Sequence, residues 1–183
     1  MQSDRPMRAD AARNRAKLLT VAYGAFASEG LEVSIDEIAR RAGVGAGTIH
    51  RHFPTKDDLY RAVIDDRLQQ INAEGQRLLD SGSPEALFEF ISLMVSQWAG
   101  SKGLVDAFAG RGLDIATISP ASEAVFIDTL RELLNQARSA GVVKPELTLT
   151  MVKAIIVGMQ AMAANAPDET AALIPLLSNA LRA

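Results

Sequence analysis

Residues 34–56 read SIDEIARRAGVGAGTIHRHFPTK, and this stretch has the pattern of two short helices joined by a turn. Apolar residues recur at helical spacing in its first half, which predicts one buried face for the first helix. Ser34 and Glu37 have the spacing of a capping box, in which a hydroxyl and a carboxylate bind free amides at a helix start. Gly43 stands where that helix must end, because glycine adopts a left-handed backbone without steric cost.

The second helix of this stretch opens with almost no side-chain bulk, as Gly45-Ala46-Gly47-Thr48. A recognition helix presses its N-terminal end into the major groove of DNA, and a slim leading end permits that approach. Donors suited to phosphate oxygens follow along the chain. They are Thr48, His50, Arg51, His52 and Lys56. The stretch is therefore predicted to be a DNA-binding helix-turn-helix.

This run resembles the DNA-binding motif of the TetR (tetracycline-repressor) family of bacterial transcriptional regulators. The family pattern I-A-x-x-A-G-V-x-x-x-T-[aliphatic]-Y-x-H-F-x-x-K is matched by IARRAGVGAGTIHRHFPTK, with His50 in place of the usual tyrosine. The upstream run RNRAKLLTVAYGAFASEG, residues 13–30, is similar to the first helix of the family. Beyond Arg67 the resemblance is one of length, helix content and layout only.

The resemblance implies a role for individual residues. Ala46 and Gly47 would lie at base edges, with Arg51 near a base or the backbone. Phosphates would be bound by Ser34, Thr48, His52 and Lys56. The usual tyrosine also binds a phosphate, so His50 alters that contact. A neutral imidazole can donate one hydrogen bond and a protonated one adds charge, which predicts DNA binding that is sensitive to acid pH.

The composition favours a helical protein that can bury a core. Hydrophobic residues make up 48% of the 183 residues, and Ala, Leu, Arg and Glu are abundant. The absence of cysteine excludes disulfides and thiolate metal sites. The first ten residues lack the apolar core of a secretory signal, and no stretch approaches the roughly eighteen apolar residues of a membrane span. We expect a cytoplasmic protein with no membrane contact.

The net charge of −3 hides an uneven distribution. Residues 5–56 hold nine Arg and Lys against five Asp and Glu, so this end is basic while the remainder is acidic. Such asymmetry suits a basic DNA-binding end joined to an acidic body, although a difference of this size also arises often by chance.

The predicted architecture is all-α, with about nine helices in two domains. A three-helix bundle containing the helix-turn-helix is expected over residues 1–55, and a larger ligand-binding and dimerisation domain over residues 56–183. Ser83-Pro84 and Ser119-Pro120 each have the pattern of an N-cap followed by proline in the first turn. Besides the two helices of the motif and a short irregular one within 102–114, the expected helices are 8–29, 56–80, 84–100, 120–140, 145–165 and 167–183.

The last two helices are expected to form a homodimer interface. The run VKAIIVGMQAM, residues 152–162, is apolar on more than one face and needs neighbours on two sides. One neighbour would be its own domain and the other a second copy of the chain, as in the resembled family. The expected interface residues are Ile155, Met159, Met162, Leu173, Leu177 and Leu181.

A site for a small-molecule effector is expected in the larger domain, as the resemblance implies. Binding pockets are mostly apolar, and methionine adapts to varied ligands. The candidate lining residues are Phe88, Ile91, Met94, Trp98, Phe108 and Phe126. Apolar side chains at helical spacing are also what any hydrophobic core requires. Each residue considered alone is therefore more readily explained as part of the core than as the lining of a pocket.

Other functions find less support in the sequence. His50 and His52 project to roughly opposite sides of a helix and have no third ligand nearby, so neither a metal nor another cofactor is predicted. Arg40-Arg41 fits a solvated helix face better than a base-reading pair. Paired carboxylates, nucleophile motifs, a P-loop and the HExxH pattern are absent, so we do not expect an enzyme. The alternative is a helix-turn-helix protein that acts through protein partners without specific DNA binding.

Overall fold

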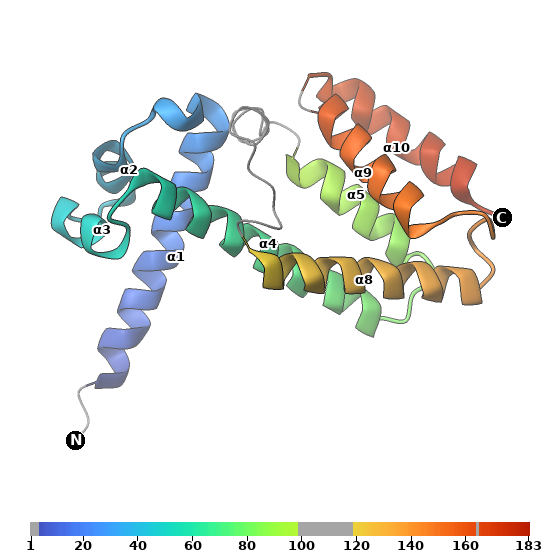
Figure 1. Cartoon of the computed structure of the whole chain (residues 1–183), viewed down its shortest axis with the longest axis horizontal. Coiled ribbons are helices and arrows are strands. Elements are labelled where there is room, and N and C mark those ends of the chain that lie inside the picture. The colour runs from blue at the N-terminus through green and yellow to red at the C-terminus, as the bar shows by residue number, and fades with distance from the viewer. Residues whose placement is uncertain (1–3, 99–118, 164) are drawn as a thin grey trace.

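The structure, a computed structural model, describes residues 4–98, 119–163 and 165–183. Within these ranges the chain forms eight α-helices, one short 3-10 helix and no strand, which confirms the all-α prediction. The short helix expected within 102–114 lies outside the described residues, as does Phe108. Figure 1 shows a small N-terminal group of helices joined by α4 to a larger C-terminal group.

The N-terminal group, called the head below, packs around a core of Leu, Ile, Ala and aromatic side chains. Phe26 and Tyr60 meet edge to face at its centre, with ring centroids 5.8 Å apart. Phe53 is 5% exposed and closes the core after the recognition helix. The head consists of α1 (Asp4–Glu29), η1 (Gly30–Glu32), α2 (Ile35–Ala42), α3 (Ala46–His52) and the first half of α4 (Lys56–Asp80).

The C-terminal group, called the body, has a second and larger core. The second half of α4 packs along α8, and α5 packs between them and the last two helices. Leu87, Phe90, Leu130 and Leu133 are among its fully buried side chains. The body consists of the second half of α4 with α5 (Ala86–Trp98), α8 (Pro120–Ser139), α9 (Leu149–Ala163) and α10 (Pro167–Leu181).

Helix α4 belongs to both cores. Leu59, Val63 and Leu68 are buried in the head, whereas Ile71 and Leu78 are buried in the body. A single continuous helix therefore carries the head on the body. The domain boundary predicted after residue 55 stays a prediction, and the packing of α4 places its first half with the head.

Gly75 permits a close approach between helices of the body. A Cβ atom at Gly75 would lie 2.6 Å from Thr129 Cγ2 of α8 and 3.0 Å from the Phe90 ring of α5. Both distances are shorter than ordinary carbon–carbon contacts. The absence of a side chain at this position therefore determines how tightly α4, α5 and α8 pack.

Three predicted helix starts differ from the structure. Helix α1 begins at Asp4, earlier than residue 8, and α5 begins at Ala86, two residues after Pro84. Helix α9 begins at Leu149 instead of Pro145. The residues before α9 form a turn at 145–146, in which Leu147 N–H donates to Lys144 O (3.1 Å). Before this turn the chain pairs with the C-terminus, since Lys144 N–H donates to Leu181 O (3.0 Å) and Ala183 N–H to Val142 O (3.3 Å).

None of the helices in the described ranges combines the length and the apolar character that a bilayer crossing requires.

Candidate DNA-binding surface

Ser34 caps α2, but the predicted capping box is only half formed. Ser34 Oγ accepts a hydrogen bond from Glu37 N–H at 3.2 Å. The reciprocal bond from the Ser34 amide to the Glu37 carboxylate was predicted wrongly. Within the described residues that carboxylate accepts hydrogen bonds from Arg40 and Arg41 instead. Two guanidinium donors on the next turn outcompete one backbone amide, because charge-assisted hydrogen bonds are stronger.

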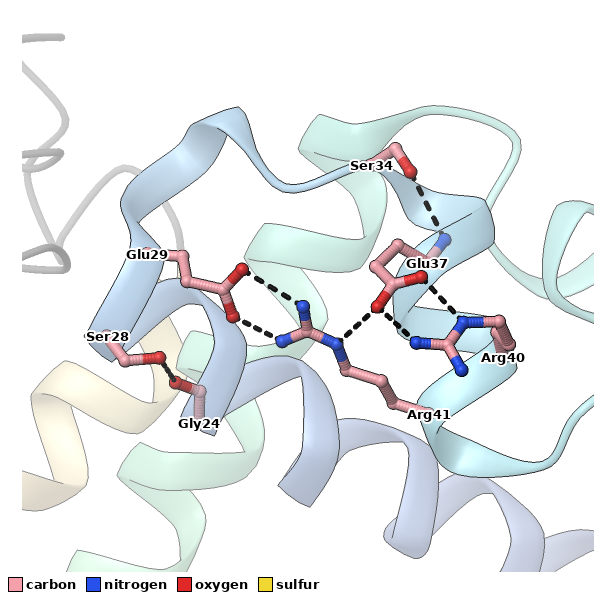
Figure 2. A network of polar contacts seen from close by, with 7 residues as sticks. All are labelled: Gly24, Ser28, Glu29, Ser34, Glu37, Arg40 and Arg41. Atoms are coloured by element: carbon pink, nitrogen blue, oxygen red, sulfur yellow. Dashed lines mark hydrogen bonds and ion pairs between the residues drawn. The ribbon is translucent and has the colours of Figure 1, made fainter.

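Arg41 joins α2 to the end of α1, as Figure 2 shows. Its Nε donates to Glu37 Oε1 at 2.7 Å, and its Nη2 donates to Glu29 Oε2 at 3.0 Å. Arg40 donates to the same Glu37 carboxylate at 2.7 and 2.8 Å. Hydrogen bonds from Arg40 and then Arg41 lower the pKa of Glu37 to about 2. The hydrogen bond from Arg41 likewise lowers the pKa of Glu29.

This network assigns the paired arginines a role that the sequence did not reveal. Arg40 and Arg41 were expected to be a solvated face, and Arg40 is exposed. Both guanidinium groups nevertheless bind carboxylates of the head. The Arg40–Glu37 pair lies within α2, whereas the Arg41–Glu29 contact links α2 to the end of α1 and so helps to position the helix-turn-helix.

The turn between α2 and α3 forms as the sequence predicts. Gly43 has φ +68°, in the left-handed region that favours glycine, and ends α2. Its N–H donates to Arg40 O at 3.1 Å, and the Val44 N–H donates to Ala39 O at 2.9 Å. Gly45 then precedes α3 with an extended backbone. Val44 is therefore flanked by one glycine on each side, so it is the only residue with a side chain in this turn.

Helix α3 presents its polar side to solvent. Ile49 is its one buried residue and packs into the head core. Ala46, Gly47 and Thr48 form its exposed leading end. The other predicted contact residues on α3 are also exposed, namely His50, Arg51 and His52.

Lys56 and Ser34 lie at helix starts that flank α3. Lys56 is the first residue of α4 and is half-buried. A complete capping box holds this start, because Thr55 Oγ1 accepts from Asp58 N–H (3.1 Å) and Asp58 Oδ2 accepts from Thr55 N–H (3.0 Å). The structure thus places all eight predicted DNA-contact residues on α3 or at the adjoining starts of α2 and α4.

His50 has a partner that the sequence reading missed. Its Nε2 lies 3.0 Å from Asp36 Oδ1 on the first turn of α2, and both side chains are largely exposed. The ring therefore already binds a carboxylate where the family tyrosine would bind a phosphate. Asp36 and His50 are fourteen residues apart, and only the crossing of α2 and α3 brings them together.

The predicted effector-site residues lie mostly in the body core. Phe88, Ile91 and Met94 are each 5% exposed or less. Phe126 is partly buried, with its ring centroid 5.9 Å from that of Phe90. The Trp98 side chain and Phe108 lie outside what the structure describes.

An open groove of about 540 Å³ runs between α4, α5 and α10. Phe88 and Leu78 are among its lining residues, as are Glu74 and Arg77, which form an ion pair with each other. Phe88 is the one predicted effector-site residue that lines it.

The predicted dimer residues are divided between the core and the surface. Met159 is 8% exposed and forms a small core with Val95, against which Ile155 and Leu177 pack. Leu181 packs on the body core. Met162 and Leu173 are exposed. The other exposed large apolar side chains of α9 and α10 are Met151, Val157 and Leu176.

Comparisons with known proteins match both parts of the chain. Residues 18–63 match the bacterial regulatory proteins of the tetR family, and residues 83–183 match the C-terminal domain of SbtR-like transcriptional regulators. An HTH-type transcriptional regulator of Staphylococcus aureus (strain USA300) is 44% identical over 59 residues. That match spans 32% of this chain and 32% of that protein, so it covers about a third of the curated relative.

Two solved structures match nearly the whole chain. A TetR transcription regulatory protein from Mycobacterium vanbaalenii is 46% identical, with a TM-score of 0.79, and the match covers 97% of this chain and 100% of that one. The TetR transcriptional regulator SCO0520 from Streptomyces coelicolor is 26% identical, with a TM-score of 0.76 and coverage of 92% and 98%. The chain belongs to the TetR family of bacterial transcriptional regulators, with an N-terminal helix-turn-helix and an SbtR-like C-terminal domain.

Proposed function

We propose that the protein is a homodimeric repressor that binds a palindromic operator and leaves it when a small apolar ligand binds the body. The observation that carries this proposal is the exposed leading end of α3, formed by Ala46, Gly47 and Thr48 without a bulky side chain. Such an end can approach base edges in the major groove. Family membership supports DNA binding as the function of this surface.

Sequence choice and affinity would come from different residues. Ala46, Gly47 and Arg51 would contact base edges or lie close to them. Thr48, His52 and Lys56, together with Ser34, would bind phosphates, which supply affinity and register but little sequence information. Lys56 sits at a capped helix start, so its ammonium is held near the end of α3.

The proposed dimer would form through the outer face of α9 and α10. Val157 and Leu176 are 64% and 63% exposed, and Met162 and Leu173 are 37% exposed. Exposed apolar side chains gathered on two neighbouring helices favour a protein–protein contact. Pairing of these faces would place two heads on successive major grooves, roughly 34–36 Å apart or a multiple of that distance.

Ligand release would act through α4. A ligand that inserts among the body helices near Phe88, Ile91, Met94 and Phe126 would shift their packing against the second half of α4. Because the same helix holds the head core, such a shift would change the distance between the two heads. The ligand would favour a head spacing that no longer fits the operator, which is a coupling free energy between two sites.

Selection of a binding sequence from a random duplex library tests the function with the purified full-length chain. We expect a palindrome with half-sites one helical turn apart. Thr48→Ala and Lys56→Ala should weaken binding to operator and random DNA alike, and Lys56→Ala should reduce the salt slope by about one per subunit. Arg131→Ala on α8, an exposed cation outside the head and the proposed interface, serves as the control.

A monomeric protein with no sequence preference would overturn the proposal and support action through protein partners. Thermal-shift screening of hydrophobic compounds, followed by loss of DNA binding with each hit, would test ligand release.

A further inference from the structure

Lys17 on α1 is an exposed cation that none of the proposed DNA contacts includes. Among the described residues its ammonium forms no ion pair or hydrogen bond. It lies 3.7 Å from the position that a Cβ atom would take on Gly43. A side chain from the first helix therefore reaches the turn of the helix-turn-helix.

Lys17 is exposed, and the turn beside its ammonium carries little side-chain bulk. Gly43 and Gly45 carry no side chains, and both are exposed. Gly43 ends α2 and Gly45 immediately precedes α3, so the ammonium lies at the turn that leads into the recognition helix. Lys56 is the first residue of α4, four residues after the other end of α3. Two lysines from different helices thus flank α3.

The nearby arginines of α2 are already neutralised. Arg40 binds Glu37, and Arg41 binds both Glu37 and Glu29. Their guanidinium groups are therefore held by carboxylates of the head. Lys17 supplies a positive charge at the α2–α3 turn that no carboxylate in the described residues offsets.

We propose that Lys17 binds a backbone phosphate of duplex DNA next to the leading end of α3, adding α1 to the DNA-binding surface. This inference rests on the proposed DNA-binding function. Together, Lys17 and Lys56 would grip phosphates at the two ends of α3 and determine its register in the groove. Contacts of this kind supply position rather than base readout.

The test measures the salt dependence of binding to the selected operator and to a random-sequence duplex of equal length, with the full-length chain. Lys17→Gln should lower the slope of log K against log salt by about one per bound subunit and weaken both complexes several-fold near physiological salt. Lys17→Arg should retain the wild-type slope, because a guanidinium also binds phosphate.

Arg15 provides a matched control on the same helix. It is exposed and lies two residues from Lys17, which places it on roughly the opposite side of α1. Arg15→Gln removes the same charge and should leave the slope near that of the wild type. Equal losses in Arg15→Gln and Lys17→Gln would overturn the proposal, because they would reflect overall charge rather than a contact.

A structural role for Lys17 predicts a different result. The C-terminal carbonyl end of α2 attracts cations, so Lys17→Gln would then lower the melting temperature and leave the salt slope unchanged. That outcome would overturn the phosphate assignment while wild-type binding upheld the proposed function. Absence of duplex binding by the wild type would overturn both.

Discussion

Gly75 of α4 lies so close to Thr129 of α8 that a Cβ atom on Gly75 would be 2.6 Å from Thr129 Cγ2. Gly75→Ala should therefore destabilise the protein by about 1–3 kcal/mol through overpacking, despite the better helix propensity of alanine. Chemical denaturation monitored by circular dichroism measures this change in the free energy of unfolding.

Gly24 provides the control for this substitution. It lies within α1 and has no atom within 4 Å of its Cβ position. Gly24→Ala should stabilise the protein by about 0.5–1 kcal/mol, because alanine loses less backbone entropy in a helix. Stabilisation by both substitutions would show that α4 and α8 can move apart at no cost, contrary to the packing described.

Asp65 fastens the start of α8 to the middle of α4. Its Oδ1 accepts hydrogen bonds from the hydroxyls of Ser119 (2.5 Å) and Ser122 (3.0 Å), both nearly buried. Asp65→Asn should destabilise the protein by about 1 kcal/mol, because the amide oxygen can still accept from both serines but the hydrogen bonds lose the negative charge that strengthens them. Asp66→Asn is the control, because it removes the same negative charge from a carboxylate that, in the described part of the chain, accepts only from an exposed glutamine. It should change the free energy of unfolding less than Asp65→Asn does.

Glu37 should make the stability of the head dependent on acid pH. Its folded pKa of about 2 lies below the ordinary value of 4.5, so its stabilising contribution is present above about pH 4.5 and is lost as the pH falls towards 2. Glu37→Gln lacks this contribution at every pH. The difference in melting temperature between wild type and Glu37→Gln should therefore shrink between pH 5 and pH 3.

Glu146→Gln is the control for that pH series. Glu146 is exposed and forms no ion pair within the described residues, so its substitution should give a melting curve close to the wild type throughout. A constant difference between wild type and Glu37→Gln down to pH 3 would contradict the ionic role of the Glu37 network.

The Asp36 carboxylate beside His50 should weaken the binding of DNA. Asp36 Oδ1 lies 3.0 Å from His50 Nε2, next to the expected phosphate contacts of α3. Asp36→Asn should therefore strengthen binding to duplex DNA, because it removes a negative charge near the phosphates. The measurement is the dissociation constant on the selected operator, and unchanged or weaker binding by Asp36→Asn would contradict this placement.

Leu176 should be essential for dimer formation if α9 and α10 pair between subunits. Leu176→Glu places a charge on the most exposed apolar part of α10 and should yield a monomer in analytical ultracentrifugation. Val125→Glu on α8 is the matched control, because Val125 is also exposed, at 50%, but lies outside the proposed interface. A dimeric Leu176→Glu protein would place the interface elsewhere.

The helix-turn-helix was largely predictable because its requirements are local. Gly43 adopts the left-handed conformation expected at the end of α2, and Ser34 accepts the expected hydrogen bond at its start. Ile49 and Phe53, four residues apart, are both buried. Each of these features depends on backbone geometry within a few residues, so it can be predicted from the local sequence.

The number and order of the described helices were predictable for the same reason, whereas the exact starts of α5 and α9 were not. Proline restricts the backbone near the start of a helix, but it does not determine which residue begins the first hydrogen-bonded turn. At α9 distant residues contribute, because Lys144 pairs with Leu181 and the chain then makes a turn at residues 145–146 before the helix begins.

What the sequence by itself determined is therefore the set of helices and the pattern of the DNA-contact motif. Only the tertiary structure decided the long-range partners of the polar side chains: Glu29 with Arg41, His50 with Asp36, and Ser119 with Asp65. It also separated buried Met159 from exposed Leu176 on the last two helices. The physical reason is that helix crossing angles and close approaches, such as the one at Gly75, arise from packing across long stretches of chain, which local patterns do not encode.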